Sequence, residues 1–204
     1  MFALKGHSKI LVHQKFEIAE LVGFETRNKY EILDENLRVI GFAAEQGKGA
    51  LQLLMRHFLG HWRSFEIFFF NENRQLMLKA KHPFRWYFDR LEIEDASGRA
   101  LGVIEKRFSI FHKRFDMISP EGNVLFEVKS PLWKIWTFIF RRQGQEKATV
   151  SKRWTGFLAE AFTDKDRFLV NYQDPSLSEQ ERHLLLAAAV YIDLIYFEKK
   201  ASDS

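Results

Sequence analysis

The stretch that decides the fold is ERHLLLAAAVYIDLIYFEKK, residues 181–200, almost at the end of the chain. Its apolar run extends from Leu184 to Phe197 and contains a single charged residue, Asp193. A helix over that run is about 21 Å long, whereas a bilayer core is about 30 Å thick. A helix that is apolar on all sides must be surrounded by lipid or by protein. Its length favours protein, so we expect this helix to fill the inside of a domain.

Two polar features of this segment carry further expectations. Ser178 precedes the helix and Glu181 follows three residues later, which predicts a capping box at the helix start. Asp193 stands inside the apolar run, and an isolated charge in a core is too costly to keep. We therefore predict that Asp193 is a buried structural residue that pairs with a basic side chain or accepts hydrogen bonds.

Before the helix, the sequence repeats alternating apolar and polar residues broken by short polar turns. DRLEIEDASGRALGVIEK turns at residues 95–98, and RFDMISPEGNVLFEVK turns at residues 119–122. Period-two alternation interrupted by Asn, Asp, Gly, Pro and Ser is typical of antiparallel hairpins. Sequential hairpins close most readily into a barrel, because closure removes exposed strand edges. We predict one domain, residues 1–204, built as a mostly antiparallel barrel around the C-terminal helix.

The amino-acid composition limits the cellular compartment and the type of partner that we expect for this domain. The chain has a net charge of +4, 15% aromatic residues and no cysteine. Without cysteine there are no disulfides and no thiolate metal sites, which fits a reducing compartment. The first residues lack the pattern of a signal peptide, so we expect a cytoplasmic protein. The mildly basic charge permits an anionic partner, but by itself it is more typical of an ordinary solvated surface.

Three strings carry a resemblance to a known family: ILVHQKFEIAELVGFETRNKYEILDENLRVIGFAAE, SKRWTGFLAEAFTDKDRF and AAAVYIDLIYFE. They resemble the phospholipid scramblases, and the chain looks like a short bacterial-type member. The resemblance implies a Tubby-like fold, a closed antiparallel β-barrel of about twelve strands enclosing a hydrophobic C-terminal helix. The implied activity is passage of phospholipids between bilayer leaflets, which depends on calcium in animal members. No spacing of residues supports bond-breaking chemistry, so we expect no catalytic residue.

The calcium segment proposed for that family corresponds here to DKDRFLVNYQDP, residues 164–175. Asp164 and Asp166 take its first and third positions, but Leu169 replaces the glycine at position six and Pro175 the carboxylate at position twelve. Two carboxylates are too few for tight binding, so calcium would bind at about millimolar concentrations at best. The alternative is an ordinary polar turn that leads into a strand. We expect no other cofactor.

Two segments combine aromatic and basic residues beside a proline: KAKHPFRWYFDR and SPLWKIWTFIFRR. Trp flanked by Lys and Arg is typical of the bilayer interface. In the second segment both strand faces are apolar, so one face should be covered by lipid, by a loop or by a dimer partner. The hypothesis is a non-covalent contact with anionic head groups through Lys79, Lys81, Arg85, Trp86, Trp133, Lys134, Trp136, Arg141 and Arg142.

Two functions remain open. The first is a scramblase-like protein that binds lipid peripherally on the inner face of the plasma membrane and moves phospholipids between leaflets. The second is a soluble Tubby-like module that binds a ligand, a protein partner or another copy of itself, without lipid transport. Nucleic acid is not an expected partner in either case. A buried helix offers no evident lipid path, so transport through the domain would require the fold to open.

Overall fold

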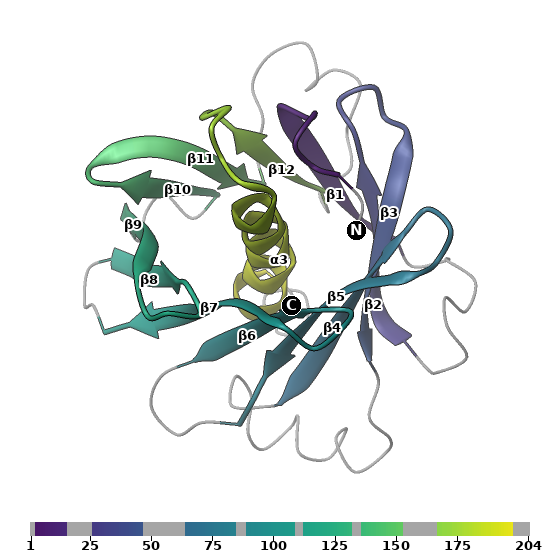
Figure 1. Ribbon diagram of the computed structural model, residues 1–204, viewed down its shortest axis with the longest axis horizontal. Helices are drawn as coiled ribbons and strands as arrows, with labels where there is room; N and C mark the ends of the chain where they lie inside the picture. Colours follow the sequence, from purple (N-terminus) through teal and green to yellow (C-terminus); the bar gives the residue numbers. More distant parts are fainter. Residues whose placement is uncertain are drawn as a thin grey trace.

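The computed structural model is a closed antiparallel barrel with a helix inside it (Figure 1). It describes residues 3–15, 26–46, 64–84, 89–108, 112–131, 136–152 and 167–197. The elements within these ranges are β1 (Lys9–Lys15), β2 (Thr26–Leu33), β3 (Val39–Gln46), β4 (Phe65–Asn71), β5 (Leu76–His82), β6 (Arg90–Asp95), β7 (Ala100–Arg107), β8 (His112–Ile118), β9 (Val124–Pro131), β10 (Thr137–Arg142), β11 (Gln145–Ser151), β12 (Arg167–Tyr172) and α3 (Glu179–Tyr196). The predicted fold class, a mostly β, closed antiparallel barrel around a C-terminal helix, is confirmed.

Strand order around the barrel follows the order along the chain. Each strand pairs antiparallel with its sequence neighbours, and β1 closes the barrel on β12, from Lys9 opposite Asn171 to His13 opposite Arg167. Consequently the short turns after β2, β4, β6, β8 and β10 all lie at one end of the barrel, which we call the turn end. Helix α3 starts at the turn end and finishes at the opposite one, which we call the helix-exit end.

The hairpins form where alternation and turn chemistry agree. In β6, Leu91 and Ile93 are buried while Glu92 and Glu94 face outward. The turn after β6 is organised by Asp95, whose Oδ1 accepts hydrogen bonds from the backbone N–H groups of Ser97 and Arg99. Gly98 closes this turn with φ +86° and Gly122 closes the turn after β8 with φ +88°, a conformation that favours glycine. Both hairpins lie where the sequence predicted them.

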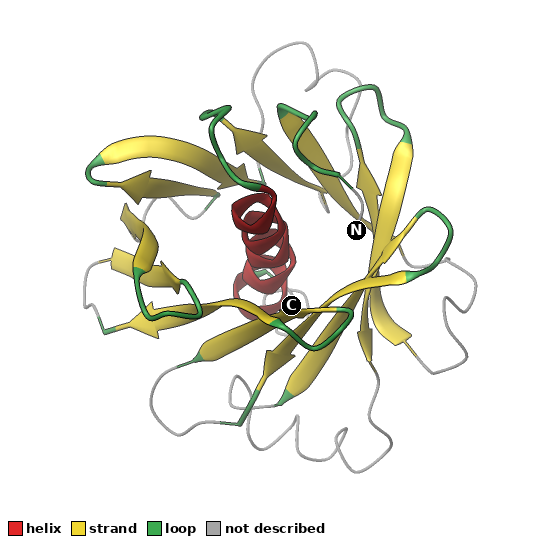
Figure 2. Cartoon of the chain, viewed as in Figure 1, coloured by secondary structure: helices red, strands yellow, loops and turns green. Residues whose placement is uncertain are grey.

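Helix α3 is surrounded by strands (Figure 2). Every residue from Glu181 to Leu194 is buried, in agreement with an apolar run that has no solvent face. The capping box is present: Ser178 Oγ accepts from the Glu181 backbone N–H, and the Glu181 carboxylate accepts from the Ser178 backbone N–H at 2.8 Å. In the part of the chain that the structure describes, no helix combines the length and the apolar character needed to cross a bilayer.

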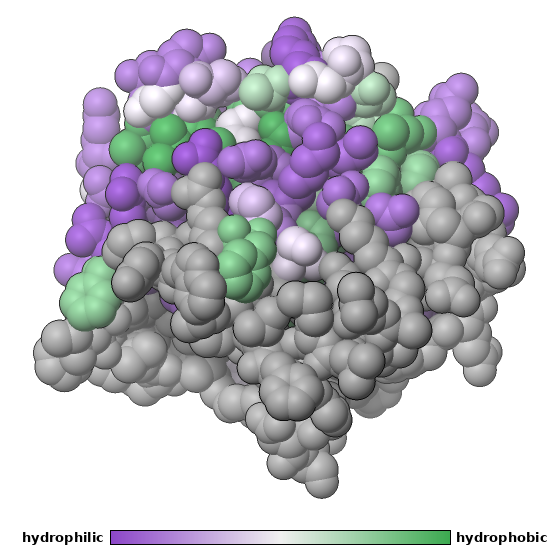
Figure 3. All heavy atoms as spheres, turned by 90° about the horizontal axis from the view of Figure 1, so that it is seen from below, coloured by the Kyte–Doolittle hydropathy of each residue, from purple (hydrophilic) through white to green (hydrophobic). Residues whose placement is uncertain are grey.

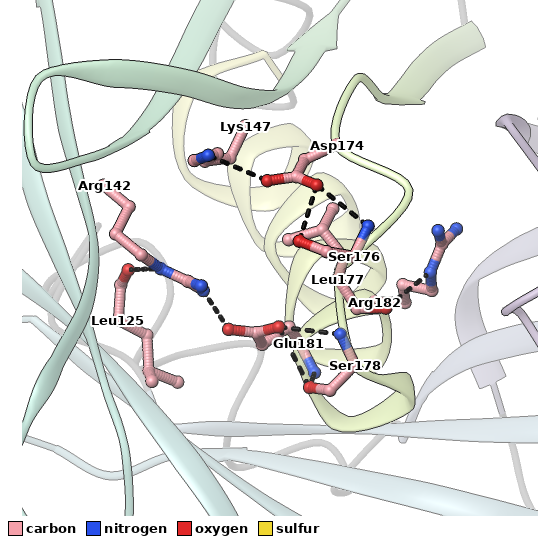
Figure 4. A network of polar contacts seen from close by, with 9 residues as sticks. All are labelled: Leu125, Arg142, Lys147, Asp174, Ser176, Leu177, Ser178, Glu181 and Arg182. Carbon is pink, nitrogen blue, oxygen red and sulfur yellow. Dashed lines mark hydrogen bonds and ion pairs between the residues drawn. The ribbon is translucent and has the colours of Figure 1, made fainter.

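The start of α3 is held at the turn end by charged side chains (Figure 4). Arg142, at the end of β10, donates to the Leu125 carbonyl oxygen and to the Glu181 carboxylate. Arg182 is buried, donates to the carbonyl oxygens of Leu4, His7 and Leu177, and lies over the Tyr172 ring at 4.6 Å. These contacts satisfy the charged first turn of a helix whose remainder is apolar.

We expect deletion of residues 184–204 to destroy the domain. Each large apolar side chain that α3 buries contributes about 1.5–3 kcal/mol, and several together exceed the roughly 5–15 kcal/mol of net stability of a typical domain. The truncated chain should be insoluble, or should bind a hydrophobic dye and show no cooperative melt in calorimetry. A truncated monomer that melts near the temperature of the full chain would contradict the enclosed-helix architecture.

Gly102 provides a finer test of how closely the strands approach α3. Its φ is +156°, and a Cβ there would lie 2.7 Å from the Ile118 carbonyl oxygen and 3.0 Å from Leu184 Cδ1. We expect Gly102→Ala to lower the free energy of unfolding by about 1–3 kcal/mol, because the core must shift to accept the methyl group. Gly6→Ala is the control, since nothing lies within 4 Å of the Cβ position there. Equal melting temperatures for the two variants would refute this packing argument.

Candidate functional site

The structure separates the residues that the sequence suggested for a lipid-contact surface. Arg85, Trp86, Trp133 and Lys134 lie outside the described residues, as do the calcium candidates Asp164 and Asp166. Lys79 and Lys81 are on the outer face of β5, Arg141 and Arg142 are at the turn end of β10, and Trp136 is at the helix-exit end. The described candidates therefore do not form one surface.

Lys79 and Lys81 are engaged with the neighbouring strand. Glu94 on β6 lies 3.6 Å from Lys79 Nζ and 2.8 Å from Lys81 Nζ. The hydrogen bond to Glu94 raises the pKa of Lys81 above its ordinary value. On the side of the barrel that lies at the bottom of Figure 1, the described surface is mostly hydrophilic with scattered apolar side chains (Figure 3). Glu66 and Glu92 add their attraction to that of Glu94 at Lys81, so these lysines lie among carboxylates of the protein itself.

The two arginines of β10 also have carboxylate partners. Arg141 Nη2 lies 2.8 Å from Glu146 Oε1 on β11. Arg142 donates a hydrogen bond to the Glu181 carboxylate at the start of α3, and its guanidinium lies 4.7 Å from the centroid of the Phe126 ring. Arg142 therefore has a structural task that sequence analysis did not foresee, because its partner Glu181 comes from a distant element.

Trp136 packs against the end of the helix. Its ring stacks on Phe197, the residue that caps α3, with centroids 5.2 Å apart. In β10 itself, Phe138 and Phe140 are buried and point inward, while Ile139 is half-buried on the outer face. The earlier part of the apolar segment, residues 132–135 with Trp133, lies outside the described residues. Within the described part of β10, the apolar outer face is thus reduced to Ile139.

Asp193 is the centre of a buried polar group at the helix-exit end. It is 2% exposed, accepts a hydrogen bond from the Tyr30 hydroxyl at 2.9 Å, and lies 3.6 Å from Lys152 Nζ. The ammonium of Lys152 also lies 4.6 Å from the Phe197 ring centroid. The last turn of α3 has no basic residue of its own, and the carbonyls at a helix C-terminus carry partial negative charge. Lys152, just after β11, supplies the cation that this helix end lacks.

A second polar cluster lies at the same end. His82 stacks on Phe65 at 4.6 Å, and its Nε2 is 3.6 Å from Asp89 Oδ1. Lys106 Nζ lies 3.3 Å from Asp89 Oδ2. Burial pushes the pKa of Asp89 upward, but His82 and Lys106 outweigh it, so the pKa lies below its ordinary value. Burial raises the pKa of the nearby Tyr191. The cluster thus places the Asp89 carboxylate between one imidazole and one ammonium group.

The inner wall of the barrel is polar elsewhere at this end too. Glu45, 1% exposed on β3, accepts a hydrogen bond at 2.7 Å from Asn28 on β2, which in turn accepts one from Gln14 on β1. Among the described residues, no group of three or more His, Asp and Glu side chains is arranged to hold a metal ion. The interior therefore changes from apolar around most of α3 to polar and internally paired where the helix finishes.

Sequence reasoning missed one arrangement of charge on the outside. Arg107 on β7 lies opposite Arg114 on β8, and Arg114 lies opposite Lys129 on β9. All three are exposed and form a row across three strands near the helix-exit end, which we call the basic row. The residue after Arg107 is Phe108, which is 76% exposed. The signal was present only as isolated basic residues in the predicted strands, because the row depends on strand register.

Comparisons with known proteins agree with the resemblance. A family model described as Scramblase matches residues 1–199. The chain is 24% identical over 96% of its length to a phospholipid scramblase family protein of Schizosaccharomyces pombe, and 28% identical over 95% of its length to Phospholipid scramblase 1 of Homo sapiens. It spans 61% and 64% of those two proteins. It is 22% identical over 93% of its length to Altered inheritance rate of mitochondria protein 25 of Saccharomyces cerevisiae. No solved structure matches the chain significantly.

We expect Asp193→Ala to destabilise the barrel strongly. The change removes the carboxylate beside Lys152, whose side chain is 11% exposed, and breaking a buried pair costs roughly 3–5 kcal/mol. In a domain of this size the melting temperature should fall by on the order of 10 °C. The control is Glu72→Ala, an exposed residue in the turn after β4, which should melt like the parent. An Asp193→Ala variant with the parent's melting temperature would show that the pair contributes nothing.

Proposed function

The chain belongs to the scramblase family, and from that premise we propose that it binds phospholipid bilayers peripherally and moves phospholipids between leaflets. The observation that carries the proposal is the family match over residues 1–199, together with relatives named phospholipid scramblases. We further propose that it works at the inner face of the plasma membrane with the Tubby-like barrel as its scaffold. Calcium, if it acts at Asp164 and Asp166, would be a weak effector.

The interior of the barrel supports a mechanism at the bilayer surface. Buried residues from Glu181 to Leu194 fill the inside, and Arg142 and Arg182 fix the start of the helix. A lipid passing through the barrel would have to displace this helix together with the Lys152–Asp193 pair. Perturbing a bilayer from outside requires no such change, so we propose that the outer surface and the rim at the helix-exit end make the functional contact.

One observation favours the alternative function. Four basic residues that the sequence assigned to lipid contact, Lys79, Lys81, Arg141 and Arg142, are each paired with a glutamate. A barrel whose surface charges are balanced in this way is suited to act as a binding module for a small ligand, a protein partner or a second copy of itself, without transport. Contact with vesicles separates the two functions.

The full chain should float with vesicles of phosphatidylcholine and phosphatidylserine at low salt. Binding should weaken as salt rises, because at physiological ionic strength charges are screened over about 8 Å. Vesicles that carry the protein and a fluorescent phospholipid should lose more than the outer-leaflet signal when dithionite is added, whereas protein-free vesicles should lose only that part. Absence of flotation with anionic vesicles at low salt would favour the binding module, and flotation without extra dithionite quenching would limit the function to lipid binding.

A further inference from the structure

The basic row is a built feature of the outer sheet. Directly opposite residues on neighbouring strands share a face, and strands lie about 4.8 Å apart, so Arg107, Arg114 and Lys129 span roughly 10 Å. The adjacent residues Phe115 and Val128 are buried in the core, which confirms that the row faces outward. Like charges placed directly opposite one another destabilise a sheet. Folding alone therefore gives no reason for this arrangement.

Two members of the row have no counter-charge among the described residues. Arg107 turns back to Asp116, at 2.7 Å, and to Glu105, at 3.3 Å. Within the described ranges, the side chains of Arg114 and Lys129 form no ion pair and no hydrogen bond. They differ in this respect from Lys79, Lys81, Arg141 and Arg142. The unbalanced positive charge on this part of the barrel is thus concentrated at Arg114 and Lys129.

An acidic row gives the patch a direction. Glu105, Asp116 and Glu127 lie opposite one another on the same three strands. They are two residues nearer to the turn end than the basic row, which is about 6.6 Å along a strand. An anionic surface that approaches from the helix-exit end meets the cations first and the carboxylates behind them. Asp116 is buried and, like Glu105, lies within ion-pair distance of Arg107, so Glu127 is the exposed carboxylate of the row. An approach from the turn end meets Glu127 before Lys129 and Arg114, so the exposed charges favour the helix-exit end.

Phe108 indicates what kind of anionic surface fits. It continues β7 beyond Arg107 toward the helix-exit end, and a phenyl ring exposed to 76% gains by leaving water. Phe84, which follows β5 at the same end, is 40% exposed. Aromatic rings beside Lys and Arg match a bilayer interface, where head groups carry the charge and the ring can enter the apolar boundary. A protein that binds duplex nucleic acid makes on the order of six to ten contacts with phosphates. The three cations of the basic row are too few for that.

We propose that the basic row, with Phe108 at its edge, is the surface through which this protein docks on anionic phospholipid, with the helix-exit end toward the bilayer. The proposal rests on the proposed function, because it names the part of the protein that makes the membrane contact. It replaces a contact through Lys79, Lys81, Arg141 and Arg142 with one through residues that the sequence analysis did not select.

The test uses the full chain and vesicles of phosphatidylcholine with or without phosphatidylserine at low salt. Arg114→Gln/Lys129→Gln should weaken binding to the anionic vesicles by about tenfold to thirtyfold, since each basic residue near an anionic surface contributes about a factor of five. Phe108→Ser should also weaken it. The matched control is Arg38→Gln/Arg74→Gln, which removes the same charge from exposed side chains at the turn end and should bind like the parent. None of these variants should melt below the parent, and Arg114→Gln/Lys129→Gln should melt slightly above it because two opposed like charges are removed.

Because the chain has no cysteine, orientation can be read with a single polarity-sensitive dye. Attached at Phe108→Cys the dye should shift to shorter wavelength on anionic vesicles, and attached at Arg74→Cys it should not. If the parent binds and the Arg114→Gln/Lys129→Gln variant binds equally well, or if the Arg38→Gln/Arg74→Gln control loses as much, the docking surface is wrong while the proposed function stands. If the parent binds an oligonucleotide through this row and binds no vesicle, both are wrong.

Discussion

An apolar helix with no solvent face is the constraint on which the rest of this structure depends. Once residues 184–194 are committed to burial, something must enclose them on every side, and twelve strands in sequence order do so without leaving an edge. The enclosed helix then limits what may be charged inside. Two carboxylates of the helix have a cationic partner from the barrel side, Arg142 for Glu181 at the start and Lys152 for Asp193 near the finish. The buried Arg182 instead donates to backbone carbonyl oxygens. The barrel and the helix are therefore two halves of one core.

The same constraint moves function to the outside and to the ends. A filled interior leaves the rim and the outer strand faces as the surfaces that can meet a partner. On the outer face of β5 and β6, Lys79 and Lys81 both lie beside Glu94, whereas on β8 and β9 the exposed Arg114 and Lys129 have no carboxylate partner among the described residues. Such unpaired positive charge can attract and orient a neighbouring anionic surface, whereas charge that is balanced by an ion pair cannot.

Much of the fold was accessible from the sequence because it depends on local signals. The period of the apolar run, the spacing of Ser178 and Glu181, and the turn residues at 95–98 and 119–122 are all short-range, and each led to the element that forms. The sequence indicated that Asp193 needs a basic or hydrogen-bonding partner. It could not indicate that this partner is Lys152, because Lys152 follows β11 and lies far from Asp193 in the sequence. The basic row was out of reach for a more specific reason. The register of β8 and β9 shifts between Met117 and Ile118, and counting from the turn without that shift would put the buried Val128, instead of Lys129, opposite Arg114.

The closure of β1 on β12 has a consequence for how the chain is made. The first strand cannot find its partner until residues 167–172 have been synthesised, and the helix that fills the interior follows later still. Contacts so distant in sequence are slow to form, because the loop entropy is lost before the contacts repay it. Until α3 is in place, the inward-facing apolar side chains of the strands lack the surface on which they pack. Closing the barrel therefore joins the parts of this fold that lie farthest apart in the sequence, which makes it the pairing with the highest entropic cost.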